Sequence, residues 1–182
     1  MKHIPESLDH DGRIRLEAYH LGCEEELFDI VKRSQAEIHP WMGWCPPEYC
    51  IEDTRERVAS RQPAWEAGEE YDFLIKDNES GQILGSCGLN HINYEYNFAN
   101  LGYWVRSDRT RQNVATEAVA ILADFGFTYL KLTRLEILAK IDNIASQRVA
   151  EKANALKEGR LRNRIKISDE VHDAYMYSLI PE

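Results

Sequence analysis

The sequence predicts one α/β domain of the α+β type, spanning residues 1–182, with about four helices flanking a mixed, mostly antiparallel sheet of about seven strands. Two observations support this fold class. Strand-like and helix-like segments alternate along the chain without a repeat, a low-complexity tract or a linker, which favours one layered domain. In addition, residues 101–123 combine a strand, a polar turn and an apolar-faced helix, and the other elements can be placed around this unit.

The first third of the chain predicts one strand and two helices. Polar and apolar residues alternate over 13–19, as in a half-buried strand. A helix is expected from near Gly22 to Pro40, with three glutamates in its first turn, where acidic side chains interact favourably with the helix dipole. An aromatic, proline-flanked loop follows over 39–47. A second helix is then expected over 51–68, and we expect Pro63 to break or kink it.

The middle of the chain predicts three antiparallel strands, which end in the central unit. Residues 71–76 and 83–92 are strand-like and are joined by a turn rich in Asp, Asn, Ser and Gly. A second turn near 94–98 leads into a strand over 99–106. The elements expected after the central helix are a strand over 134–141, a short helix over 143–154 and a closing hairpin formed by 155–167 and 171–180.

The central unit has the properties of an anion site. Tyr103, Trp104 and Val105 suit a strand, residues 107–113 are polar and basic, and a helical apolar pattern begins at Val114. The free N–H groups in the first turn of a helix, together with its dipole, favour bound anions. Arg106, Arg109 and Arg111 add positive charge there. The expected ligand therefore contains phosphate groups.

Composition excludes several classes of function. The formal net charge of −9 disfavours general nucleic-acid binding and favours basic or amine-bearing substrates. No apolar run approaches the roughly 20 residues of a membrane span, and the first residues lack the apolar segment of a signal peptide. We therefore expect a cytoplasmic protein that does not enter a membrane. The four cysteines lack Cys-x-x-Cys spacing, so we interpret them as free thiols and expect no metal site.

The central unit also resembles the acyl-CoA loop of the GNAT acetyltransferases, and among them the Rim-type enzymes that acetylate protein N-termini. Gly-Tyr-Trp-Val-Arg at 102–106 and Ala-Thr-Glu-Ala at 115–118 match the Rim-type pattern. Between them, Thr110 replaces a Gln or Arg of the family, and Arg111 and Asn113 stand where glycine is frequent. Asn tolerates a left-handed backbone better than most residues, and Arg111 would add charge beside a pyrophosphate, so we expect the loop to function.

A second match to this family is Asn-x-x-Ser at 143–146. In GNAT enzymes the Asn side chain bonds the pantetheine arm of the cofactor and the Ser lies near the thioester sulfur. Asn143 also suits the N-cap of a helix, and the two roles are compatible. The resemblance therefore implies acetyl-CoA as the cofactor and acetyl donor, with Ser146 as the catalytic acid. The implied cofactor-binding residues are Trp104, Val105, Arg106, Arg111, Gln112, Asn113, Val114, Ala115, Thr116, Asn143 and Ser146.

The implied reaction is attack of a neutral amine on the acetyl thioester. A backbone N–H near residues 104–106 would stabilise the oxyanion. An α-amine has a pKa of about 7.7–8.0 and a lysine amine about 10.4, so the α-amine costs roughly 3.4 kcal/mol less to deprotonate. No general base stands out, because a glutamate of some Rim-type enzymes maps near Ile165. The alternatives for the general base are His91, His39, Glu37 or a water held by Asn90.

The expected substrate residues are Trp41, Trp44, Asn90 and Tyr103, although the two tryptophans suit a core equally well. The leading hypothesis is an acetyl-CoA-dependent N-acetyltransferase that acts on a protein N-terminal α-amine. The resemblance suggests ribosomal proteins with a serine or alanine terminus. One alternative is a small-amine acetyltransferase for polyamines or amino sugars, and another is a non-catalytic acyl-CoA-binding module. A monomer and a homodimer are both compatible with the sequence.

Overall fold

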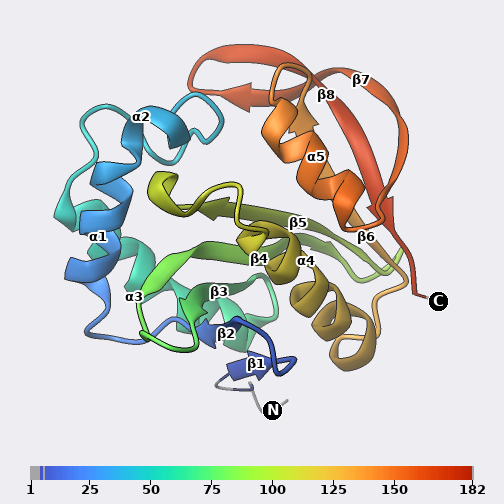
Figure 1. Ribbon diagram of the computed structural model, residues 1–182. Coiled ribbons are helices and arrows are strands. Elements are labelled where there is room, and N and C mark those ends of the chain that lie inside the picture. The colour runs from blue at the N-terminus through green and yellow to red at the C-terminus, as the bar shows by residue number, and fades with distance from the viewer. Residues whose placement is uncertain (1–4, 6, 182) are drawn as a thin grey trace.

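The computed structural model describes Pro5 and residues 7–181. One eight-stranded sheet has the order β1-β2-β3-β4-β5-β6-β8-β7 (Figure 1). The strands are β1 (Ser7–Asp9), β2 (Ile14–Ala18), β3 (Tyr71–Asp77), β4 (Ile83–Asn93), β5 (Phe98–Val105), β6 (Arg134–Lys140), β7 (Leu156–Ile167) and β8 (Glu170–Leu179). The α-helices are α1 (Glu24–Arg33), α2 (Gln35–Ile38), α3 (Ile51–Ala67), α4 (Val114–Asp124) and α5 (Ile144–Lys152).

The α+β class with a mixed, mostly antiparallel sheet is confirmed, since β5 and β6 form the parallel pair of an otherwise antiparallel sheet. The expected counts of seven strands and four helices are each one too low among the described residues. The additional elements are the three-residue β1 and the four-residue α2. Both are too short to show a hydrophobic period in the sequence.

Two apolar cores lie on opposite faces of the sheet. Helices α4 and α5 cover one face, and α1, α2 and α3 lie against the other (Figure 1). Side chains alternate along β5, so Leu101 belongs to the core under α4 and Trp104 belongs to the core under α1 and α3. We call these the α4 face and the α3 face. Residues of β5 therefore contribute to both sides of the sheet.

Two helix predictions were wrong in detail. Pro63 does not break α3, which is continuous over Ile51–Ala67. Beyond Pro63, the buried Trp65 packs its ring against Phe73 at 4.8 Å, and this contact holds the last turn in place. The helix expected from Gly22 to Pro40 is divided at Ser34, whose buried hydroxyl accepts a hydrogen bond from the Ser107 backbone N–H at 3.1 Å.

The sheet opens between β5 and β6. Their pairing is limited to Phe98↔Arg134, Ala99↔Leu135 and Asn100↔Glu136. Beyond Asn100, β5 remains paired with β4 as far as Val105↔Gly85, while β6 diverges. This leaves a V-shaped gap along the second half of β5, directly before the loop that enters α4.

The expected free thiols are present. Cys23, Cys45 and Cys87 are buried and Cys50 is exposed, and none of them is in a disulfide. No helix within the described residues combines the length and the apolar character that crossing a membrane requires.

Candidate functional site

The gap between β5 and β6 exposes backbone groups of β5. The N–H of Arg106 donates to the carbonyl of Leu84 at 2.8 Å, toward β4. Hydrogen bonding alternates along an antiparallel pair, so the N–H of Trp104 also faces β4, and those of Tyr103 and Val105 face the gap. A backbone donor was expected near 104–106. The alternation assigns this role to Tyr103 and Val105, whose N–H groups can polarise a carbonyl placed in the gap.

The loop before α4 keeps a glycine-like backbone without glycine. Asn113, the N-cap of α4, has φ of 63° and ψ of 4°, the left-handed conformation expected for it. Arg111 is also left-handed, with φ of 60°. The first backbone bond of the helix runs from the Glu117 N–H to the Asn113 carbonyl at 3.0 Å. The N–H groups of residues 114–116 precede it and are available to an anion.

The side chains of this loop differ in their availability. The Arg106 guanidinium is held by Asp108 at 2.7 Å, which lowers the pKa of that carboxyl. Gln112 accepts a hydrogen bond from Arg13 at 2.9 Å, and Asn113 accepts one from Lys152 at 3.2 Å. Arg111 is exposed and has no ion pair or hydrogen bond to any described residue. Of the three predicted arginines, Arg111 is therefore free to meet a ligand, whereas Arg106 is engaged by Asp108 and the charge of Arg109 acts on the same carboxyl.

Ser146 and Tyr103 form a hydroxyl pair beside the gap. Asn143 caps α5, because its Oδ1 accepts the Ser146 N–H at 3.0 Å. The Tyr103 hydroxyl lies 3.1 Å from Ser146 Oγ and donates to the Ser146 carbonyl at 2.9 Å. Burial raises the pKa of Tyr103 to about 12, so its hydroxyl keeps its proton at neutral pH. The structure brings these two residues together on the α4 face, opposite the face on which Trp104 is buried.

The aromatic loop covers the α3 face near the gap. Trp44 packs against Trp104 with ring centroids 5.9 Å apart, and Lys140 of β6 lies over Trp41 at 5.4 Å. A Cβ placed on Gly43 would lie 3.5 Å from the Ser168 backbone nitrogen, so the loop also meets the β7–β8 turn. The Trp104 side chain is 7% exposed, which leaves its indole unavailable to a ligand.

Asn90 lies at the apex of the gap. The Nδ2 of Asn100 donates to the Asn90 Oδ1 at 2.8 Å, and Asn100 is the last residue of β5 that pairs with β6. The histidines proposed as bases lie elsewhere. His91 is exposed, and the His39 ring contacts the Cys45 carbonyl at 2.9 Å within the aromatic loop. Neither histidine has a hydrogen bond to Tyr103 or Ser146 in the described structure.

A buried charged cluster on the α3 face was missed by the sequence analysis. Asp72 of β3 contacts Arg61 at 2.5 Å and Arg57 at 3.5 Å, and Arg57 lies 4.6 Å from the Trp44 ring centroid. Burial raises the pKa of the Asp72 carboxyl, and the two guanidinium groups oppose that rise. The available signal was a single aspartate inside the apolar run 71–75.

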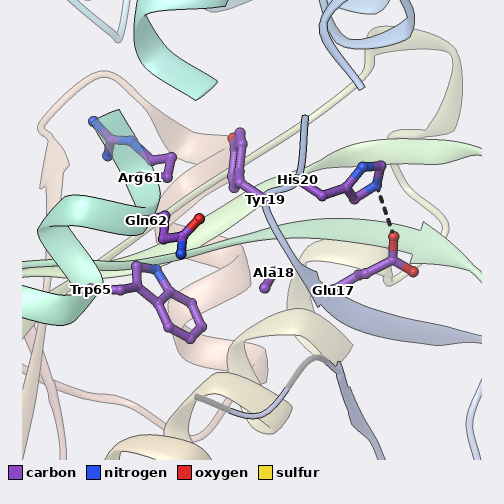
Figure 2. Close-up of a pocket in the computed structure, with 7 residues that line it drawn as sticks. All are labelled: Glu17, Ala18, Tyr19, His20, Arg61, Gln62 and Trp65. Atoms are coloured by element: carbon purple, nitrogen blue, oxygen red, sulfur yellow. Dashed lines mark ion pairs between the residues drawn. The ribbon is translucent and has the colours of Figure 1, made fainter. Parts of the chain in front are cut away.

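A cavity of about 480 Å³ lies beside this cluster. It is between the end of β2 and α3, and Tyr19, Arg61 and Trp65 are among its lining residues (Figure 2). Strands β3 and β4 separate β2 from β5, so this cavity is distinct from the gap. No group of three or more His, Cys, Asp or Glu side chains is arranged to bind a metal within the part of the chain that the structure describes.

Comparisons with known proteins agree with this geometry. A family model described as the acetyltransferase (GNAT) domain matches residues 13–155. The chain is 34% identical over 113 residues to the Bacillus licheniformis protein named uncharacterized N-acetyltransferase p20, covering 62% of this chain and 64% of that protein.

Solved structures share the whole fold. A Vibrio cholerae protein described as a candidate ribosomal-protein-serine acetyltransferase superposes with a TM-score of 0.85, at 28% identity over 96% of this chain and 97% of that one. The ribosomal L7/L12 α-N-protein acetyltransferase RimL, solved with coenzyme A, gives a TM-score of 0.88 at 22% identity, covering 96% of this chain and 98% of that chain. At 22% identity, the similarity to RimL shows a shared fold and nothing more specific.

Proposed function

Because the chain belongs to the GNAT family of N-acetyltransferases, we propose that it transfers the acetyl group of acetyl-CoA to the α-amine of a protein N-terminus. The observation that supports this most strongly is the gap between β5 and β6. Two backbone N–H groups face it, a pair of hydroxyl groups borders it, and the N-terminus of α4 follows it. These are the groups that an acyl transfer from a phosphate-bearing thioester requires.

The loop and α5 fit the acetyl donor. The left-handed backbone at Arg111 and Asn113 leaves the amides of residues 114–116 open, as a pyrophosphate requires. Arg111 adds a positive charge there that no described side chain neutralises. We assign Asn143 and Ser146 to the pantetheine arm, since the cap holds both in place. When bound, acetyl-CoA supplies the thioester whose acyl carbon the amine attacks.

We assign two catalytic roles to residues around the gap, stabilisation of the oxyanion and protonation of the leaving sulfur. The N–H groups of Tyr103 and Val105 would stabilise the negative charge that develops on the carbonyl oxygen. The proton that the departing sulfur needs would come from the Ser146 hydroxyl, which would regain a proton through Tyr103, hydrogen-bonded to it at 3.1 Å, while the proton lost by the amine would pass to solvent water. Because Tyr103 remains protonated at neutral pH, the pair has a proton to give.

An N-terminal amine is the acceptor that needs the least help from a base. Its pKa of about 7.7–8.0 leaves a useful neutral fraction at pH 7, and no histidine or acidic side chain of the described residues hydrogen-bonds to the hydroxyl pair. The names of the Vibrio cholerae protein and of RimL support ribosomal proteins as the acceptor class. The net charge of −9 favours, as a second candidate, a small cationic amine such as a polyamine.

The test is a rate comparison with acetyl-CoA as donor. The acceptors are peptides with a free serine or alanine N-terminus, the same peptides with a formylated N-terminus, spermidine and an amino sugar. We expect turnover with the free peptides and none with the blocked ones. Turnover with the small amines and not with the peptides would contradict the proposed acceptor. Absence of acetyl-CoA binding in a calorimetric titration would contradict the proposed site.

A further inference from the structure

Three residues form a row across the α3 face beside the gap. Asp72 of β3 is opposite Gly88 of β4, and Gly88 is opposite Gly102 of β5. A Cβ placed on Gly88 would lie 1.7 Å from the Asp72 Oδ1. A Cβ on Gly102 would meet nothing within 4 Å. The Asp72 carboxylate therefore lies over Gly88, next to open space over Gly102.

The two oxygens of Asp72 have different surroundings. Oδ2 contacts the Arg61 Nη1 at 2.5 Å and the Arg57 Nη2 at 3.5 Å. No described residue donates a hydrogen bond to Oδ1, whereas Arg61 donates one to Oδ2. The Asp72 side chain is 8% exposed, and Oδ1 is not among the fully enclosed side-chain atoms without a partner, so a water or a ligand can reach it. The two arginines fix the orientation of the group and leave Oδ1 available to a ligand.

The charges of this cluster balance without a ligand. Arg61 also contacts Glu70 at 2.6 Å, so two guanidinium groups face two carboxylates. Figure 2 shows Arg61 together with Tyr19 at the adjoining cavity, and the Tyr19 hydroxyl donates to Ser86 at 2.9 Å. Because the cluster is neutral overall, Oδ1 would accept a hydrogen bond from a neutral donor without strongly attracting a cation.

The open space over Gly102 adjoins the reacting position. Gly102 directly precedes Tyr103, whose N–H faces the gap. Cross-strand Cβ positions are about 4.5–5.5 Å apart, so a nitrogen over Gly102 is within reach of Oδ1 directly or through one water. An amine in this space would therefore lie between Asp72 and the β5 backbone donor.

We propose that Asp72 Oδ1 binds the neutral form of the acceptor amine over Gly102 and so selects amines whose neutral form is appreciably populated near pH 7. This inference rests on the proposed function and extends it to the recognition of the acceptor. It favours an α-amine over a lysine side chain, because the neutral form of the α-amine is the more abundant of the two at that pH. Removal of the amine proton is not assigned to Asp72, because its carboxylate is held by two arginines.

The first test compares Asp72→Asn with Glu70→Gln. Each removes one carboxylate from Arg61. In Asp72→Asn, however, the new amide would direct its oxygen to the arginines and its NH₂ toward Gly102, so the acceptor atom is lost. We expect Asp72→Asn to raise the KM for the acceptor peptide about ten- to hundredfold, with the acetyl-CoA dissociation constant unchanged. Glu70→Gln should change neither. Equal KM values in the two variants would overturn the proposal.

The second test does not alter the charged cluster, so it remains decisive if Asp72→Asn fails to fold. Gly102→Ala would fill the open space, and Gly159→Ala is its control, a strand glycine with equally open surroundings. We expect neither variant to lower the melting temperature, and we expect Gly102→Ala to lower kcat/KM for the peptide at least tenfold. An unchanged kcat/KM would refute the assigned position. Failure of the proposed function would instead appear as absence of peptide turnover in the wild-type protein.

Discussion

Replacing Arg111 tests whether the loop before α4 stores backbone strain. A left-handed conformation costs a residue with a Cβ about 1–2 kcal/mol. Arg111 has φ of 60° and no side-chain partner among the described residues to offset that cost. Alanine keeps the Cβ and removes the charge, whereas glycine removes both. The difference between Arg111→Ala and Arg111→Gly therefore isolates the backbone contribution from the charge.

The expected difference is small but measurable. Glycine loses about 0.5–1 kcal/mol more backbone entropy on folding than alanine, which leaves Arg111→Gly more stable than Arg111→Ala by about 0.5–1 kcal/mol. For a chain of this size, that raises the melting temperature by about 1–4 °C. Thermal and urea unfolding of the two variants measure it. Acetyl-CoA titration should show similar losses of affinity in both, because both lack the guanidinium.

Asn113, the other left-handed residue of this loop, provides a comparison for the backbone strain at Arg111. Asn tolerates the left-handed region better than Arg, and its side chain accepts a hydrogen bond from Lys152 at 3.2 Å. Asn113→Gly should therefore gain less stability than Arg111→Gly gains over Arg111→Ala. If Arg111→Gly is no more stable than Arg111→Ala, the left-handed backbone at 111 is not strained, and the explanation is wrong.

Three further results are expected. Pro63→Ala should stabilise α3 by about 2 kcal/mol, because the helical cost of proline, about 3 kcal/mol, exceeds its effect on the unfolded chain; an unchanged urea midpoint would contradict this. Arg134 lowers the pKa of Glu158 from 4.5 to about 2, so the stability from this contact is complete above pH 4.5 and lost as pH falls toward 2. Glu158→Gln should therefore show a shallower loss of stability across that range, and a wild-type slope would count against it. Ser146→Ala and Tyr103→Phe should each lower kcat with little change in acetyl-CoA affinity. The double variant should lower kcat little further than either single variant, because the two hydroxyl groups act together. An unchanged kcat in both single variants would exclude the hydroxyl pair from catalysis.

Structural features that form between residues close in the sequence were predictable. The cap at Asn143 follows from an Asn three residues before Ser146, and the structure shows that hydrogen bond at 3.0 Å. The left-handed Asn113 follows from the tolerance of Asn for that region. In both cases the interaction is formed within a few residues, so neighbouring sequence is sufficient to predict it.

Long-range contacts were not predictable in the same way. The partners of Asp72 are on α3, and the row from Asp72 to Gly102 depends on the register of two strand pairs. Tyr103 was expected to contact the acceptor, but the alternation of β5 directs its side chain to Ser146 on α5. A shift of one residue in strand register would reverse these faces, and a single sequence does not determine that register.

The position of β8 has a consequence for the folding of the chain. β8 lies between β6 and β7, both of which precede it in the sequence. Until residues 170–179 dock, β6 and β7 each present an unpaired edge, and the loop at Gly43 lacks its contact with the β7–β8 turn. Such edges are where partly folded chains associate. The interval before β8 inserts is therefore the period in which this protein is most prone to aggregate, and conditions that slow insertion should lower its refolding yield.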